Sequence, residues 1–409
     1  GAPDPPVPAP RGGGPARDAV PLWIKWTKRT LLDEGHNALQ LCTILQLLVR
    51  YADLFAPHRE LFTPHMVTSL AKLGFASSAS AESKKLAVDL VALLLAWDDE
   101  AEAPPRKRRR TEYALPAHLR EITAGFLVRF VSLSLEPIAR NEVTRHAYAL
   151  LEQLYTAPAW RGVQVRLAVL QRALIHTEVS EQHVGPMANA LAALEVVTRD
   201  KSAAWFTAHL AQLHKLLEKT LASDRAPLLD AARPTLARMF GALPAAPEAD
   251  APPDAAAFCA FAENTIAEGL RTGTHLATTL ALLGAWSAAH AGAADRHVPA
   301  LIKTLTRLAK EHLAAPGSEG TLQLLREALA LLMARVSQLG DQRRWFLSAM
   351  VQLVEKSPSV PLCRFLLDAM RTWVLRGEAF PTVKEKAGVL VKMLCFEARD
   401  ADLFRALLD

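Results

Sequence analysis

The chain has 409 residues, well above the ~100–200 residues of a typical single domain, so it forms either several compact domains or one extended repeat array. Hydrophobic residues make up 51% of it, Ala and Leu predominate, and aromatic residues reach only 6%, which excludes a large β-sheet protein. The net charge of +5 equals the charge of one run of five basic residues, so the rest of the chain is neutral in sum and offers no continuous basic face for nucleic acid.

The first predicted element is a disordered linker at residues 1–18. It contains the stretch PDPPVPAPRGGGPARD, which cannot bury enough apolar surface to offset the entropy lost on ordering. Because the sequence starts with Gly1 and not with Met, we expect the chain to be a segment of a longer protein.

Helical segments and two loops follow in order. We predict HEAT-like helices over residues 19–97, 118–240 and 254–409. Residues 98–117 form a charged, basic loop, and residues 241–253 form a Pro- and Ala-rich acidic loop. Both loops contain proline, and we expect both to be exposed and mobile.

The helices are predicted from apolar residues that recur every three or four positions, which places them on one face of a helix. Three such stripes are Trp160, Val163, Leu167, Leu170 and Leu174; Phe206, Leu210, Leu213, Leu217 and Leu221; and Val298, Leu301, Ile302, Leu305 and Leu308. No comparable run alternates with a period of two residues, so no strand is expected.

Residues typical of helix starts lie between the stripes. Thr382 and Glu385 have the capping-box spacing, in which a hydroxyl and a carboxylate accept hydrogen bonds from backbone amides of the first turn. Asp254, Asp295 and Asp341 are predicted to mark further helix starts.

We count roughly sixteen helices of about twenty residues each, so a helix pair recurs about every forty residues, as in HEAT arrays. The predicted fold is therefore all-α, an α-solenoid of HEAT-like antiparallel helix pairs. Neighbouring pairs can bury each other's apolar stripes without sharing a sequence motif.

The sequence predicts no enzyme and no catalytic, cofactor-binding or metal-binding residue. Its only Gly-rich run, Gly12–Gly14, lies in the predicted linker and lacks the flanking strand and GK[ST] ending of a phosphate-binding loop. It also contains neither an HRD-type catalytic loop nor a DFG triplet, so it holds no protein kinase active site. We expect no cofactor and no small-molecule substrate.

The histidines and cysteines are interpreted as packed or surface residues. No HExxH motif occurs, and no CxxC pair or metal-type spacing joins the cysteines. The residues concerned are the pairs His209 and His214, His58 and His65, and His290 and His297, together with Cys42, Cys259, Cys363 and Cys395.

Tryptophans at helix ends or on helical stripes are expected to pack between helices, because large rings fill repeat interfaces, although one or two could instead line a binding groove. They are Trp97, Trp205, Trp286, Trp345 and Trp373. The most apolar stretch, Leu86–Trp97, has twelve residues and is shorter than the ~20 that cross a membrane, so we expect a soluble protein without a membrane partner.

The sharpest local motif is the basic stretch PPRKRRRTE at residues 104–112. Its composition is that of a nuclear localisation signal, made of Arg106, Lys107, Arg108, Arg109 and Arg110. A solvated charged loop without further role fits it equally well, and direct contact with nucleic acid is a third, weaker alternative.

Two stretches resemble the TRRAP family of transcription-associated proteins. They are residues 61–97, LFTPHMVTSLAKLGFASSASAESKKLAVDLVALLLAW, and residues 355–396, EKSPSVPLCRFLLDAMRTWVLRGEAFPTVKEKAGVLVKMLCF. Together they cover about a fifth of the chain and occur in the order found in the family, within its helical-repeat region. The loops at 98–117 and 241–253 do not match the family, so no contact residue is transferred from it.

The resemblance implies a segment of a pseudokinase scaffold that is related to phosphatidylinositol 3-kinase-like kinases but lacks their catalysis. Such proteins hold histone acetyltransferase complexes of the SAGA and NuA type and bind transcription activators. The expected partners are therefore subunits of such a coactivator complex and activator domains, and the expected location is the nucleus.

Two other functions remain alternatives. A nuclear transport receptor is also a helical solenoid, but it needs an acidic inner face to hold basic cargo signals, and the near-neutral array argues against it. An active kinase of the same superfamily would carry its catalytic domain outside this segment.

Overall fold

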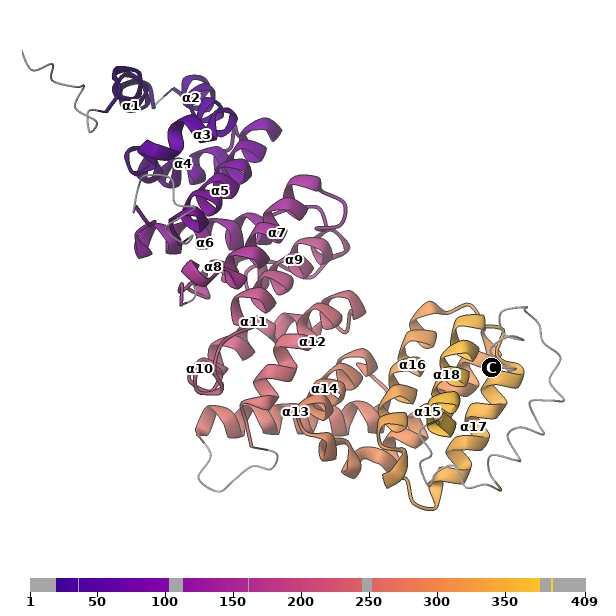
Figure 1. Ribbon diagram of the computed structural model, residues 1–409. Coiled ribbons are helices and arrows are strands. Elements are labelled where there is room, and N and C mark those ends of the chain that lie inside the picture. The colour runs from indigo at the N-terminus through magenta and orange to yellow at the C-terminus, as the bar shows by residue number, and fades with distance from the viewer. Residues whose placement is uncertain are drawn as a thin grey trace, which may run out of the picture. The chain divides into compact units, whose positions relative to one another are not determined.

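The computed structural model describes residues 20–35, 37–102, 113–160, 162–244, 252–375 and Lys384. Within these ranges the regular structure consists of eighteen α-helices and four short 3-10 helices, with no strand, which confirms the all-α prediction. The chain divides into two compact units, Gly1–Val169 and Leu170–Asp409, and each is described separately below (Figure 1).

The first unit begins with three helices that pack loosely and continues with two close pairs. Helix α4 packs on α5 and α6 on α7, while α4 also contacts α6 and α5 contacts α7, so the four helices form two rows. The elements are α1 (Leu22–Glu34), α2 (Ala38–Arg50), α3 (Ala52–Phe55), η1 (Ala56–Leu61), α4 (Thr63–Phe75), α5 (Ala81–Glu102), α6 (Ala117–Ser132), α7 (Glu142–Thr156) and η2 (Pro158–Trp160).

The second unit repeats this two-row arrangement after α8 (Ala168–Leu174), the helix that contains the division between the units. Helices α11, α13, α15 and α17 pack in one row, and α12, α14, α16 and α18 pack in the other. The elements are α9 (Glu181–Thr198), α10 (Ala203–Ala208), α11 (Leu210–Ala222), α12 (Ala226–Gly241), α13 (Pro253–Thr272), α14 (Leu276–Ala289), η3 (Ala291–His297), α15 (Val298–Ala314), α16 (Glu319–Ala334), η4 (Val336–Gln338), α17 (Gln342–Lys356) and α18 (Val360–Leu375).

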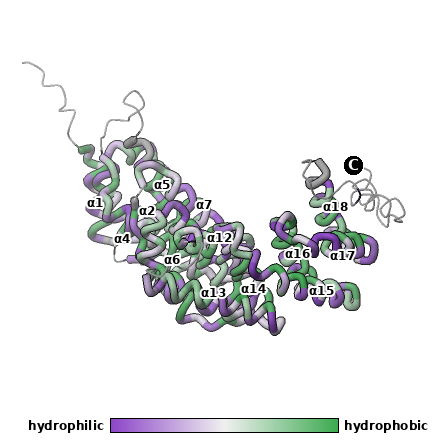
Figure 2. The backbone as a smooth tube through the Cα atoms, turned by 90° about the horizontal axis from the view of Figure 1, so that it is seen from below, coloured by the Kyte–Doolittle hydropathy of each residue, from purple (hydrophilic) through white to green (hydrophobic). Residues whose placement is uncertain are grey.

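Most helices bury one face, and hydrophobic and hydrophilic residues alternate along their tubes in Figure 2. The stripe from Val298 to Leu308 is buried along α15 except at Ile302, which is half-buried. Helix α14 is apolar on nearly all sides because α12, α13 and α16 surround it. These helices therefore depend on their neighbours for the burial that stabilises them.

Side-chain caps fix several helix starts. Asn37 accepts hydrogen bonds from the amides of the first turn of α2, and Asn141, Ser202 and Ser318 do the same for α7, α10 and α16. At the end of α13, Gly273 adopts the left-handed conformation (φ +80°) that a residue without Cβ adopts at little cost.

Ion pairs connect helices about one repeat apart in the second unit. Glu178 pairs with Lys219 at 2.5 Å, Glu195 with Arg238 at 2.7 Å, and Asp295 with Arg335 at 2.5 Å, across separations of 41, 43 and 40 residues. The separations agree with the predicted repeat of about forty residues. Because these pairs are partly exposed, each contributes little stability and mainly fixes how neighbouring helices align.

The helix predicted from Trp160 to Leu174 is wrong for its first half. All five apolar residues of the stripe are buried, but only α8, from Ala168, is helical beyond the 3-10 turn that ends at Trp160. Gly162 (φ +88°) turns the chain, and residues 163–166 are extended or irregular. The periodic apolar residues predicted correctly which side chains are buried, but they did not predict the backbone conformation of this segment.

Other boundaries also differ from the prediction. Helix α5 continues to Glu102, beyond the expected end at residue 97, because Asp98 is buried against the following helix and is not part of a solvated loop. The stripe from Phe206 to Leu221 is divided between α10 and α11 at His209. Asp341 precedes α17 and Asp254 lies in the first turn of α13, whereas Asp295 lies inside η3 and pairs with Arg335.

Several expectations fall outside the described residues. They are the linker at 1–18, the central parts of both loops at 103–112 and 245–251, and the capping box formed by Thr382 and Glu385.

The described tryptophan side chains are buried, half-buried in the case of Trp205, or exposed. Trp97, Trp160 and Trp286 are buried, and the Trp286 ring stacks on Phe240 with centroids 5.0 Å apart, as expected for packing residues. Trp345 is 39% exposed, and both Trp23 and Trp26 of α1 are exposed as well. The packing interpretation is therefore wrong for Trp345.

No individual helix within the described ranges combines the length and apolar character that crossing a membrane requires, although the bent pair Ala38–Arg50 and Ala52–Leu61 meets those criteria when taken together.

A buried ion pair joins α5 to α6, and its carboxylate also holds the segment that precedes α6. The Asp98 carboxylate accepts hydrogen bonds from the Leu115 amide at 2.8 Å and from Arg120 at 2.9 Å. Nearby, Arg59 donates to the Tyr113 carbonyl at 2.9 Å, and the Arg120 guanidinium lies 5.8 Å from the centre of the Trp160 ring. These contacts hold residues 113–115 against the helices of the first unit.

We predict that Asp98→Ala destabilises the first unit by ~3–5 kcal/mol, because it leaves the Arg120 charge and the Leu115 amide buried without their acceptor. Asp33→Ala removes the partner of Arg29 in an exposed pair on α1 and serves as the matched control, with an expected change of ~0.5 kcal/mol or less. Urea unfolding followed by far-UV circular dichroism measures both, and equal losses for the two variants would contradict the structural role of Asp98.

Candidate functional site

The basic residues predicted as a nuclear localisation signal, Arg106 to Arg110, lie outside the described residues, so their role stays a prediction. The structure does place their flanks: α5 ends at Glu102, and residues 113–115 are held by Arg59 and Asp98.

The six histidines of the three pairs lie in helices or at helix ends. His209 separates α10 from α11 and stacks on Trp205 at 4.3 Å between ring centres. His290 hydrogen-bonds through Nε2 with the carbonyls of Phe240 and Leu243, and His297 lies 3.5 Å from the Glu263 carboxylate. His58 lies in η1 and His65 in α4.

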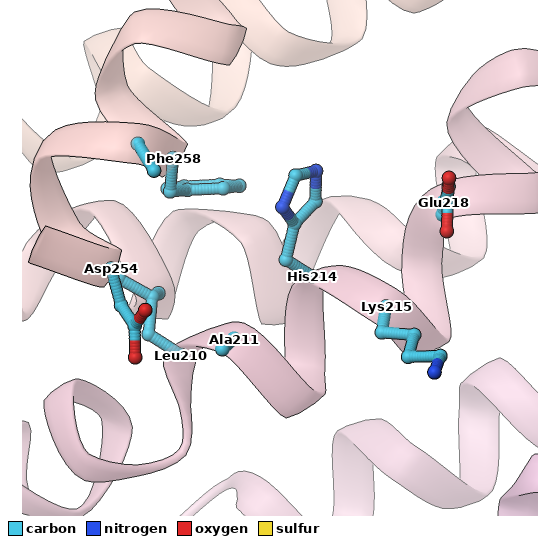
Figure 3. Close-up of a pocket in the computed structure, with 8 residues that line it drawn as sticks. Leu210, Ala211, His214, Lys215, Glu218, Asp254 and Phe258 are labelled. Atoms are coloured by element: carbon cyan, nitrogen blue, oxygen red, sulfur yellow. The ribbon is translucent and has the colours of Figure 1, made fainter.

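A pocket of about 320 Å³ lies between α11 and α13 and contains His214 (Figure 3). The imidazole packs on two rings of α13, with centroids 5.3 Å from Phe258 and 4.6 Å from Phe261. In Figure 3 the side chains of Lys215 and Asp254 point away from the imidazole. The described residues that line the pocket include no serine, threonine or cysteine.

Burial lowers the pKa of His214 below its ordinary value, and the nearby Glu218 carboxylate opposes this effect. The pKa of His297 is lowered in the same way, with the Glu263 carboxylate opposing the burial. Both imidazoles are therefore favoured in the neutral form, which suits side chains packed among apolar groups.

Within the part of the chain that the structure describes, no three His, Cys, Asp or Glu side chains are grouped as metal ligands would be. Cys42, Cys259 and Cys363 are free thiols, and Cys395 lies outside the described residues. Burial raises the pKa of the Cys259 thiol, which disfavours the reactive thiolate.

Eight of the eleven exposed large apolar side chains of the described residues lie at the start of the first unit. We call this area, on α1, α2 and α3, the N-terminal apolar surface. Trp26 is 63% exposed and Leu39 76%, and the other members are Leu22, Trp23, Leu32, Leu47, Tyr51 and Leu54. An exposed apolar area rimmed by polar residues is typical of protein-binding surfaces.

This surface is not predicted from the amino-acid sequence. In α1 the buried residues Ile24 and Leu31 are seven positions apart and lie on one face, whereas Trp23 and Trp26 lie off that face. Large apolar residues outside the buried stripe were the available signal, but we interpreted the tryptophans of later helices as packing residues and did not consider these two.

Two grooves open on the first unit. The α2–α5 groove, of about 600 Å³, is lined by the apolar side chains of Leu47, Tyr51 and Leu86 and by charged groups of both signs. The α4–α7 groove, of about 510 Å³, lies between the end of α4, the start of α5, the end of α6 and the start of α7. Both are within the size range of ligand-binding clefts, and both can accept side chains of another protein.

A family model described as the Tra1 HEAT repeat ring region matches residues 8–112 and 100–409. The SAGA complex/NuA4 acetyltransferase complex subunit Tra1 of Schizosaccharomyces pombe is 27% identical over 406 residues, covering 95% of this chain and 11% of that protein. The subunit of the same description from Saccharomyces cerevisiae is 29% identical over 92% of this chain and 11% of its own length.

The human transformation/transcription domain-associated protein is 22% identical over 93% of this chain and 12% of its own length. The chain thus spans about a tenth of the length of the curated relatives it matches. The similarity extends far beyond residues 61–97 and 355–396, which first indicated it.

The lowered pKa of His214 predicts how stability changes with pH. Because the folded protein resists protonating this imidazole, the unfolded chain takes up the proton first, and the free energy of unfolding falls as the pH drops through about 6.5 toward the lower folded value. His214→Gln is expected to reduce that loss.

Urea unfolding at pH 5 and pH 8 measures this change, with His176→Gln on an exposed residue of the same unit as the matched control. If both variants lose as much stability as the wild type between the two pH values, the lowered pKa of His214 is refuted.

Proposed function

The chain belongs to the family of the Tra1 HEAT repeat ring region, and on that premise we propose that it is a non-catalytic scaffold segment of a histone acetyltransferase coactivator subunit. The observation that carries the proposal is its similarity, over more than nine tenths of its length, to relatives described as subunits of the SAGA and NuA4 complexes. In this role the segment binds partner subunits and transcription activators and performs no turnover.

The geometry of the first unit supports a binding role. The N-terminal apolar surface exposes large side chains. Covering them with another protein is favourable by ~25 cal/mol for each Å² of apolar area removed from water, so large side chains contribute most. Indole rings are also enriched among the residues that dominate protein–protein affinity, and Trp23 and Trp26 both lie on this surface.

Affinity purification of the full-length protein from nuclear extract, followed by mass spectrometry, tests the proposal. We expect acetyltransferase subunits to be recovered, and we expect Trp26→Ser together with Leu39→Ser to reduce the yield of at least one subunit. Lys303→Ser, on an exposed residue of α15, is the control that leaves the yields unchanged. Recovery of import cargo in place of acetyltransferase subunits would contradict the scaffold function.

We propose that the segment acts in the nucleus and that Arg106 to Arg110 direct its import. The proposal is supported by the composition of the cluster and by relatives described as transcription-associated. Replacing all five residues by alanine is expected to move a fluorescent fusion of this chain to the cytoplasm. A fusion that stays nuclear would show that the cluster is only a charged loop.

A further inference from the structure

The N-terminal apolar surface carries three aromatic rings that are exposed to solvent. Trp26 is 63% exposed, Trp23 45% and Tyr51 43%. The Trp23 ring packs edge to face on Phe55 of α3, with centroids 5.3 Å apart, and Phe55 packs on Phe62 in the same way. The Trp23 ring is therefore held by buried rings while part of it stays in contact with solvent.

The two tryptophans lie on the same side of α1. They are three positions apart, and residues at this spacing are neighbours on a helix surface. Leu22 lies beside them because it precedes Trp26 by four positions. Neighbouring aromatic rings are what proline-binding grooves present to a polyproline II helix.

A proline-rich tract precedes α1 in the sequence. Residues 3–10 read PDPPVPAP, and Pro5 and Pro8 within them have the PxxP spacing of segments that such grooves bind. Prolines favour the polyproline II helix, whose backbone carbonyl groups make no internal hydrogen bonds and can accept hydrogen bonds from indole N–H groups. The tract cannot form a core of its own, but its chemistry fits a surface of aromatic rings.

The residues between this tract and α1 allow the tract to reach the rings. Gly12–Gly14 follow the tract, and glycine accepts the backbone conformations that reverse the direction of a chain. Residues 11–21 can span up to ~34 Å at ~3.1 Å per residue, whereas the 13 residues of α1 extend over only ~20 Å. The tract can therefore fold back along the whole of α1.

We infer that residues 3–10 bind the N-terminal apolar surface of the same chain as a polyproline II helix and cover Trp23 and Trp26 until a partner protein displaces them. A short tether gives such a segment an effective concentration on the order of 1 mM, so a weak intrinsic affinity is sufficient. The surface continues into the α2–α5 groove, because Leu47 and Tyr51 belong to both, and this groove can accept one end of the tract.

The inference rests on the proposed function, because it concerns access to the surface on which partner subunits are expected to bind. It goes beyond that function by naming a segment of this chain that competes with those partners.

The probe is a fluorescein-labelled peptide with the sequence of residues 1–14, added to two forms of the 409-residue chain. One form is the wild type, and the other carries Pro5→Ser, Pro6→Ser, Pro8→Ser and Pro10→Ser, so that its own tract no longer binds. Fluorescence anisotropy is expected to show that the proline-substituted chain binds the peptide about tenfold more tightly than the wild type, whose surface is already covered.

Matched controls assign the binding to the exposed indoles. Trp26→Ser in the proline-substituted chain is expected to weaken peptide binding about tenfold or more. Trp345→Ser removes another exposed tryptophan, on α17, and should leave the affinity unchanged. Because both rings are exposed, both variants should keep the circular dichroism and melting temperature of their parent chain. A peptide with alanine in place of every proline should bind far more weakly, because it lacks the preformed polyproline II helix.

The full-length protein tests the competition with partners. A subunit that binds this surface must displace the tract, so the four proline substitutions should raise its recovery in affinity purification about twofold or more.

Four results would overturn the inference: no binding of the peptide to the proline-substituted chain, equal affinity for that chain and the wild type, unchanged binding after Trp26→Ser, or unchanged recovery of every subunit. The second result would mean that the surface is open in the wild type, and the third that the tract binds elsewhere. If the peptide results contradict the inference while the full-length protein still recovers acetyltransferase subunits, the covering segment is wrong and the proposed function stands. If the peptide binds as expected but no subunits are recovered, the proposed function is wrong and the binding of the tract stands.

Discussion

Phe240 on α12 contacts Trp286 on α14 at 5.0 Å and Phe258 on α13 at 5.1 Å, so one buried ring joins three helices of successive pairs. No helix here could bury its apolar face alone, and the second unit is held together by repeated contacts of this kind. Helices of a two-row array bury most of their apolar area against the next pair. The apolar side chains that remain exposed then lie on uncovered helix faces and in grooves between helices.

The polar contacts follow from the same arrangement. Glu195 with Arg238 and Asp295 with Arg335 join helices about forty residues apart, so they set the alignment of neighbours while burial supplies the stability. The half-buried His214 fits this account because it packs on the Phe258 and Phe261 rings, and its burial lowers its pKa. The polar and ring contacts of these described residues thus serve to align and pack neighbouring helices.

The sequence predicted the fold class and the repeat length because helical periodicity depends only on which residues are buried. The stripe of α15 shows this directly, since all of its apolar positions except the half-buried Ile302 are buried. The stripe from Trp160 to Leu174 shows the limit: its side chains are buried, but Gly162 and an irregular segment take the place of half the helix. Burial can be read from periodicity, whereas local backbone geometry depends on tertiary packing as well.

The candidate binding surfaces were harder to predict from the sequence. Leu135 and Trp26 look like core residues in the sequence, and only the positions of the surrounding helices leave them exposed. Asp98 is the opposite case, because it was assigned to a charged loop and is buried in an ion pair with Arg120. The composition gives the number of apolar and charged residues. Packing and ion pairing between helices decide which of these residues remain exposed.

The dependence of each helix on its neighbours is measured most directly by amide hydrogen exchange in the Phe240→Ala variant. Removing this buried ring costs ~3–5 kcal/mol locally, and we expect faster exchange in α12, α13 and α14 with little change in α17. Faster exchange to the same extent throughout α9–α18 would indicate one undivided core, and a change confined to α12 would indicate that its neighbours do not depend on it. Either result would contradict the account.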